Sequence, residues 1–221
     1  MCGRISRTSP AEVIVEQFGV TSSAVVDLRA RYNLCPGESV AALIEHGGDR
    51  RLGSLRWGLP PRGQINIRSE GLARRPAVRE ALQHRRCVIL ADGFFEWQTV
   101  DSARLPHFFR LASRRPFGLA GIWQRGPDAS APPGAAILTC VANALVSTVH
   151  DRMPVMLDPD DCRRWLDRDA GAAALQALLR PFPSEPMEAY PVSVLVNSAR
   201  NDSPDCIRPT GGKLRLVPRT A

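Results

Sequence analysis

The residue with the most reactive chemistry in this sequence is the cysteine at position 2. Removal of Met1, which commonly follows when the next residue is small, would leave Cys2 with an α-amine and a thiol on adjacent carbons. Their reference pKa values are about 7.7–8.0 and about 8.5, so both have a nucleophilic form near neutral pH. Such an aminothiol can attack an acyl carbon with its own amine as base, or condense with an aldehyde to form a thiazolidine ring. Cys2 alone leaves both reactions open, and also a cysteine without function.

Two other residues could carry protons for either reaction. Glu96 lies between Phe95 and Trp97 after a predicted turn, and an apolar setting would raise the pKa of its carboxyl group. His150 has a reference pKa near 6.5 and could donate or accept a proton. The alternatives are a surface carboxylate for Glu96 and a buried, hydrogen-bonded imidazole for His150.

An amide and two arginines could position a substrate. Asn66 can donate and accept hydrogen bonds, so it could hold the α-amine of Cys2 without competing for its proton; otherwise it is a turn residue. Arg68 would lie on the same face as Asn66 if this segment is extended. Arg4 is two residues from Cys2 in the chain. Both arginines are candidates to bind the phosphates of a nucleic acid.

The next candidates have equally plausible structural roles. Arg152 could bind a phosphate or pair with its neighbour Asp151. Trp57 could stack on a nucleic-acid base or belong to the core. We assign the other tryptophans to the core: Trp97, Trp123 and Trp165.

Composition narrows the classes of protein that fit. The chain of 221 residues has a net charge of +7, and its 29 basic residues include a single lysine, Lys213. This balance favours a polyanionic partner only slightly over a solvated basic surface. The six cysteines form no CxxC pair, so we expect no metal site and no small-molecule cofactor. Without an apolar run long enough for a membrane span or a signal peptide, we expect a cytoplasmic protein with reduced cysteines.

These residues must be positioned by many short elements, because glycine and proline are spread throughout the chain. The pattern predicts one α+β domain over residues 1–221, with a mostly antiparallel, curved or barrel-like sheet and flanking short helices. Predicted helices follow Ser9-Pro10 and cover 76–83, 143–149, 159–166 and 172–179. Predicted strands lie at 39–45, 52–57, 87–91, from 94 onward, 107–111, 118–123, 135–141 and within 187–196.

Ordered sequence blocks resemble the SOS-response-associated peptidase family over nearly the whole chain. They are Met1-Cys2-Gly3-Arg4, RYNLCP at 31–36, WGLP at 57–60, NIRSE at 66–70, RRCVILADGFFEW at 85–97, Leu138-Thr139, HDRMP at 150–154 and VNSARNDSP at 196–204. Each block is weak evidence alone, but their shared order is specific. The connection from Pro60 to Ile65 is shorter than in many members, which affects the expected DNA groove more than the chemistry.

The resemblance implies a protein that shields abasic sites in single-stranded DNA. In this family the processed cysteine forms a thiazolidine crosslink with the ring-opened abasic sugar, and the protein removes its own N-terminal residue. The matching catalytic positions are Cys2, Asn66, Glu96 and His150. Expected DNA contacts are Arg4, Arg68, Trp57, Thr139 and Arg152. When bound to DNA, such a protein would be associated with the nucleoid.

Two other functions remain as alternatives. N-terminal-nucleophile glutamine amidotransferases also begin Met-Cys-Gly, but they use an Asn-Gly oxyanion segment, and this sequence contains no Asn-Gly dipeptide. A non-covalent module for single-stranded DNA would leave Cys2 incidental. The two DNA-binding hypotheses differ in whether substitution of Cys2 changes the response to an abasic site.

Overall fold

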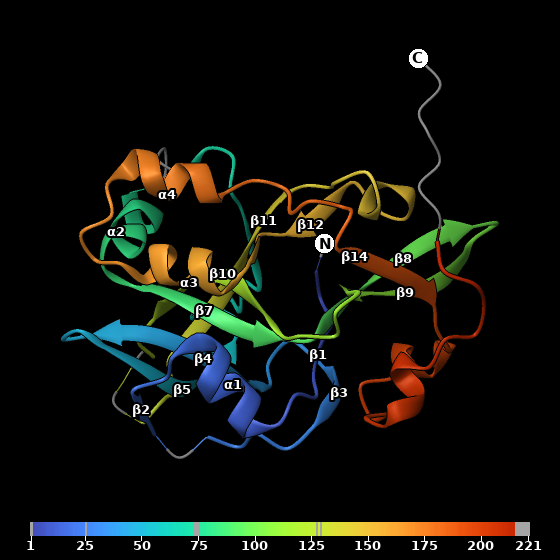
Figure 1. Ribbon diagram of the computed structural model, residues 1–221, viewed down its shortest axis with the longest axis horizontal. Helices are drawn as coiled ribbons and strands as arrows, with labels where there is room; N and C mark the ends of the chain where they lie inside the picture. The colour runs from blue at the N-terminus through green and yellow to red at the C-terminus, as the bar shows by residue number, and fades with distance from the viewer. Residues whose placement is uncertain (1, 25, 73–75, 127, 129, 215–221) are drawn as a thin grey trace.

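Two curved sheets dominate the computed structural model, one with five strands and one with nine (Figure 1). The structure describes residues 2–24, 26–72, 76–126, 128 and 130–214. The first has the order β14-β9-β8-β1-β3: Met187–Pro191, Ala103–Leu111, Gly93–Val100, Ile5–Arg7 and Arg31–Leu34. The second has the order β12-β11-β10-β7-β4-β5-β2: Arg152–Pro154, Gly134–Val141, Phe117–Gln124, Arg86–Ala91, Ser39–His46, Asp49–Trp57 and Ser22–Ser23. It also includes β6 (Asn66–Arg68) beside β11 and β13 (Met156–Leu157) beside β10.

The strand pairing confirms the predicted α+β class with a mostly antiparallel arrangement. The β4–β5 hairpin turns at Gly47 and Gly48, which have φ values of 64° and 85° that glycine adopts without steric cost. Parallel pairs are confined to β2–β5, β5–β11 and β6–β11 among the described strands. The sheets are curved but do not close into a barrel.

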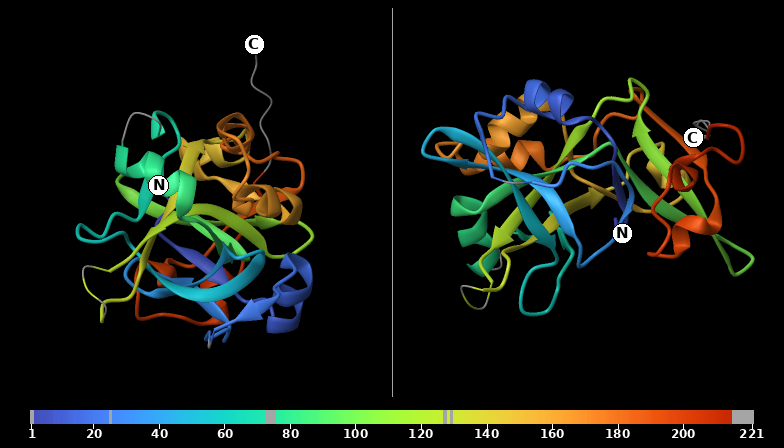
Figure 2. Two further views of the ribbon diagram at one scale, coloured as in Figure 1. Left: turned by 90° about the vertical axis from the view of Figure 1, so that its left-hand side faces the viewer. Right: turned by 90° about the horizontal axis from the view of Figure 1, so that it is seen from below.

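Four α-helices flank the sheets in the described residues: α1 (Ala11–Phe18), α2 (Pro76–His84), α3 (Pro159–Leu166) and α4 (Ala172–Leu178). Gly19 ends α1 in the left-handed conformation, and the Asp158 side chain accepts a hydrogen bond from Asp161 N at the start of α3. Helices α2 and α3 contact β7 and β10. They lie at the opposite end of the molecule from the red 3₁₀ turns at Val194–Asn197 and Pro204–Ile207 (right-hand view of Figure 2). The predicted helix at 143–149 is wrong, because only a 3₁₀ turn (η2, Val146–Thr148) forms before the chain turns into β12.

The strands that matter most for the candidate site are very short. β1 pairs with both β3 and β8, which brings the segment after Cys2 against the strand that carries Glu96. β6 pairs with β11, with Asn66 opposite Ile137 and Arg68 opposite Thr139. A strand of three residues has too little alternation to be recognised in sequence, so β1, β6 and β12 were not among the predicted strands.

Gly93 should be essential for the packing of β8. A Cβ atom at this position would overlap the ring of Phe108 and lie 2.8 Å from the backbone oxygen of Phe109 on β9. We expect Gly93→Ala to lower the free energy of unfolding by about 1–3 kcal/mol or more, as overpacked cores do. Urea unfolding followed by circular dichroism measures this loss. Gly171→Ala is the matched control, because a Cβ there meets no atom within 4 Å; equal stability of the two variants would contradict the prediction.

Candidate active site

Cys2 is completely buried, and its backbone is held by Asn66. The amide Nδ2 of Asn66 donates a hydrogen bond of 2.6 Å to the carbonyl oxygen of Cys2. The Oδ1 atom of Asn66 is buried without a hydrogen-bond partner in the described residues, so it can accept one from a group that enters the site. From the sequence we expect Asn66 to hold the α-amine of Cys2, whereas the hydrogen bond in the structure goes to the carbonyl oxygen of Cys2.

Glu96 lies on β8, which pairs with β1. The register matches Ile5 with Phe94, and Phe95 N donates to Arg4 O at 3.0 Å, so Cys2 and Glu96 come together at the end of this pairing. The Glu96 side chain is only 3% exposed, and burial raises the pKa of its carboxyl group to about 7. Burial also raises the pKa of the Cys2 thiol, and the charge of Glu96 raises it further. Near neutral pH, Glu96 can therefore both give and take a proton.

His150 faces Glu96 across the site. Its Nε2 atom is 4.0 Å from Oε2 of Glu96, and its Nδ1 atom accepts a hydrogen bond of 2.9 Å from Arg152 N. When Nδ1 accepts this bond, a neutral imidazole carries its proton on Nε2, the nitrogen 4.0 Å from Glu96. Nδ1 is also 3.0 Å from the Asp151 carboxylate, but Asp151 is 84% exposed and its effect is screened by water. Burial lowers the pKa of His150, which favours the neutral form.

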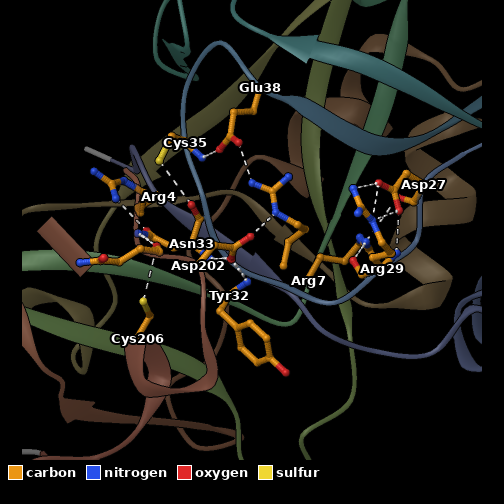
Figure 3. Close-up of polar contacts among 12 residues, drawn as sticks. Arg4, Arg7, Asp27, Arg29, Tyr32, Asn33, Cys35, Glu38, Asp202 and Cys206 are labelled. Carbon is orange, nitrogen blue, oxygen red and sulfur yellow. Dashed lines mark hydrogen bonds and ion pairs between the residues drawn. The ribbon is translucent and has the colours of Figure 1, made fainter. Parts of the chain in front are cut away.

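Arg4 anchors the N-terminal segment to the C-terminal part of the chain. Its Nη1 atom donates to Asn33 Oδ1 at 2.7 Å (Figure 3). The same atom donates to Val196 O at 2.6 Å. Asn33 is completely buried, and its amide donates to three backbone carbonyls of the same C-terminal segment. Asp202 completes this network by accepting from the backbone N–H groups of Tyr32 and Asn33. The sequence placed Arg4 near the nucleophile but gave no indication of these partners.

The other predicted DNA contacts have unequal access to a ligand. Arg68 is exposed at the end of β6, in keeping with a phosphate contact. Arg152 forms a two-point ion pair with Glu70 at 2.6 and 2.9 Å, rather than with Asp151, and also donates to Thr139 O. Thr139 is completely buried, and its hydroxyl donates to Ile67 O, so a direct DNA contact by this side chain disagrees with the structure.

Trp57 belongs to the core, which corrects its predicted role in base stacking. It is 0% exposed, and its indole N–H donates to Ile65 O at 3.1 Å. A ring with no exposed face cannot stack on a base.

Trp97, which the sequence assigns to the core, is half-buried and lies at the candidate site. It lines a cavity of about 420 Å³ together with Gly3, Arg4, Glu96, Arg104 and Asn197. Its indole N–H donates to Asn197 Oδ1 at 2.7 Å. The sequence does not predict Gly3, Trp97, Arg104 or Asn197 as site residues, and Arg104 reaches the cavity because β9 pairs with β8.

The arrangement suits condensation of a carbonyl compound with an N-terminal aminothiol. It combines an amide that fixes the cysteine backbone, a carboxyl group whose pKa is raised to about 7 by burial and an imidazole whose Nε2 lies 4.0 Å from that carboxyl group. The described residues contain no cluster of histidine, cysteine, aspartate or glutamate able to hold a metal ion. No described helix is long and apolar enough to span a membrane.

Comparison with known proteins places this site in a defined family. Residues 1–199 match the model of the SOS response associated peptidase (SRAP) family, and the chain belongs to this family. It is 36% identical to the abasic site processing protein YoqW of Bacillus subtilis, over 94% of this chain and 99% of that protein. It is 27% identical to the abasic site processing protein YedK of Escherichia coli, over 95% of this chain and 100% of that protein.

Solved structures show the same fold. A crystal structure of a protein from Bacteroides thetaiotaomicron superposes with a TM-score of 0.82 at 22% identity, covering 95% of this chain and 100% of that one. A phage-related protein from Bordetella bronchiseptica superposes with a TM-score of 0.72 at 29% identity, covering 86% and 94% of the two chains. The predicted fold class and family resemblance are therefore confirmed.

Proposed function

We propose that this protein processes abasic sites in single-stranded DNA by forming a covalent crosslink through Cys2. One observation carries the proposal: Asn66 holds the Cys2 carbonyl at 2.6 Å beside a buried Glu96 that faces His150. The relatives named as abasic site processing proteins support the choice of substrate.

The proposed reaction is a condensation without any change in oxidation state. The sugar of an abasic site is mostly a closed hemiacetal, and its opening exposes an aldehyde. The α-amine of Cys2 adds to that carbonyl carbon, and loss of one water gives an imine. The thiol then adds to the carbon of the protonated imine, gives its proton to the Glu96 carboxylate and closes the thiazolidine ring. Burial keeps this thiol protonated, so the amine is the first nucleophile.

Each polar residue has a distinct part in this scheme. His150 opens the sugar by moving a proton between its ring oxygen and hydroxyl group. Glu96, with a pKa of about 7, delivers the proton that expels water and recovers it as the ring closes. Asn66 fixes the backbone of Cys2, and its buried Oδ1 accepts a hydrogen bond from the attacking amine. Arg4 and Arg68 hold the phosphates beside the abasic sugar.

The aminothiol exists only after Met1 has been removed. We infer that the same site assists hydrolysis of the Met1–Cys2 peptide bond, which consumes one water and frees the α-amine. The chain would then act in the cytoplasm, on the nucleoid when bound to DNA.

The wild-type protein tests the proposal directly. Its Met1-processed form, verified by intact mass, is mixed with a single-stranded oligonucleotide carrying one abasic site and run on a denaturing gel. We expect a shifted band whose mass equals protein plus oligonucleotide minus one water. An oligonucleotide with a tetrahydrofuran in place of the abasic sugar is the control, because it has no aldehyde and should give no band. A processed protein that yields no adduct would overturn the proposal. If that protein binds the abasic and the tetrahydrofuran oligonucleotides equally well without a covalent bond, the result would favour the non-covalent DNA-binding module.

A further inference from the structure

Arg104 lies at the edge of the candidate active site although it is outside every sequence motif that points there. In the β8–β9 hairpin Trp97 pairs with Pro106 and Thr99 pairs with Arg104. Because side chains alternate along strands, Arg104 and Trp97 are diagonal neighbours on one face of the hairpin. The guanidinium carbon of Arg104 lies 5.6 Å from the centre of the Trp97 ring, and both residues line the cavity that contains Glu96.

The charge of Arg104 is available for a ligand. Its side chain is exposed, and within the described residues it has no ion pair and no hydrogen bond to a carboxylate. The neighbouring arginines differ in this respect. Arg4 donates to Asn33 and Val196, and Arg152 is paired with Glu70. Within the described residues, Arg104 is therefore the cation of this cavity with every side-chain hydrogen-bond donor unused, whereas Arg4 uses Nη1, and the flat ring of Trp97 restricts the orientation of Arg104.

The field of Arg104 also reaches the reactive groups. Its positive charge opposes the rise in the pKa of Glu96 and contributes to the lowered pKa of His150. An anion bound by Arg104 would consequently lie close to the site of proton transfer without occupying it.

We propose that Arg104, supported by Trp97, binds a backbone phosphate of the DNA strand next to the abasic sugar and so positions that sugar at Cys2. A guanidinium held on an aromatic face presents a fixed pair of N–H donors, which matches two phosphate oxygens. This contact, made from β9, would add to the phosphate contacts proposed for Arg4 and Arg68. Arg104 is then a positioning residue and does not take part in bond formation. This inference rests on the proposed function.

The test measures how the affinity for DNA depends on salt concentration. A variant that is merely partly unfolded would bind DNA more weakly, without a predictable change in this dependence. Each phosphate contact to a single strand contributes about 0.7 to the slope of log affinity against log salt. Fluorescence anisotropy with the tetrahydrofuran oligonucleotide should therefore give a slope about 0.7 smaller for Arg104→Gln than for wild type. Arg104→Lys should restore the slope, because lysine also binds phosphate as a point charge. Arg180→Gln is the matched control, since Arg180 is an exposed arginine beyond α4 and outside the cavity.

Crosslinking separates this inference from the proposed function. With abasic DNA, Arg104→Gln should need about three- to tenfold more DNA for half-maximal crosslinking, while Arg104→Lys, which keeps the positive charge near Glu96, should crosslink like wild type. An unaltered slope for Arg104→Gln, or the same decrease for Arg180→Gln, would overturn the role of Arg104 while leaving the crosslink in place. Failure of wild type to crosslink would instead reject the proposed function, and the anisotropy result would still show whether Arg104 binds phosphate.

Discussion

Replacing Cys2 with alanine should abolish the denaturant-stable adduct with abasic DNA. The variant keeps an α-amine that can form an imine, but it has no thiol to close the ring, and an imine hydrolyses under denaturing conditions. Alanine is small enough for Met1 to be removed, so the loss would not reflect an unprocessed N-terminus. Denaturing electrophoresis should show less than about 1% of the wild-type adduct, corresponding to loss of the nucleophile itself.

Two controls make this result specific to Cys2. Cys206→Ala removes another fully buried free cysteine and should leave the adduct unchanged. Addition of sodium borohydride should trap the imine of Cys2→Ala, and peptide mapping should place it on the N-terminal amine rather than on Lys213. Lys213, the single lysine of the chain, is paired with Glu188. A stable adduct in Cys2→Ala without reductant would contradict the thiazolidine mechanism.

Glu96→Gln should slow crosslinking by about 10²–10⁴-fold, the usual contribution of a general acid–base group. Glutamine keeps the shape of the side chain but cannot exchange a proton. The wild-type rate should change with pH around 7, where burial places the pKa of Glu96, and this dependence should be absent from the variant. Single-turnover rates between pH 5 and 9 measure both effects. The intact mass of each preparation must confirm that Met1 has been removed, because an unprocessed variant would be inactive for another reason.

Although Glu96→Gln should slow crosslinking, it should raise the free energy of unfolding at high pH. The pKa of Glu96 is about 7 in the folded protein and about 4.3 when unfolded, so the folded state binds the proton more tightly. Stability contributed by the protonated carboxyl is fully present below pH 4.3 and is lost as pH rises through 7. At pH 8, Glu96→Gln should therefore be more stable than wild type by up to about 3 kcal/mol, with little difference at pH 4. Equal urea stability of both proteins at pH 8 would show that Glu96 is not a strained, buried acid.

The longer elements could be predicted because their patterns are local. The first helix, with Gly19 at its end, and the hairpin at Gly47-Gly48 follow from capping and turn preferences of neighbouring residues. The three-residue strands could not be predicted in this way. β1 and β6 exist because β8 and β11 provide hydrogen-bonding partners far along the chain.

Burial separated residues whose sequence settings looked alike. Trp57 and Trp97 both lie in motif blocks, yet Trp57 is in the core and Trp97 lines the site. Arg152 has an acidic neighbour in sequence, but its partner is Glu70, 82 residues away. Which face of a strand meets the core and which distant charge meets an arginine are properties of the assembled sheets.

By itself, the sequence determined the family and the functional groups available at Cys2, Asn66, Glu96 and His150, because functional groups and ordered motifs are properties of the chain. Only the tertiary structure decided how those groups are arranged. The pairing of β1 with β8 buries Glu96 beside Cys2 and moves its pKa toward 7, and the β8–β9 hairpin brings Arg104 to the same cavity. The physical reason is that desolvation and cross-strand contacts depend on neighbours that are remote in sequence.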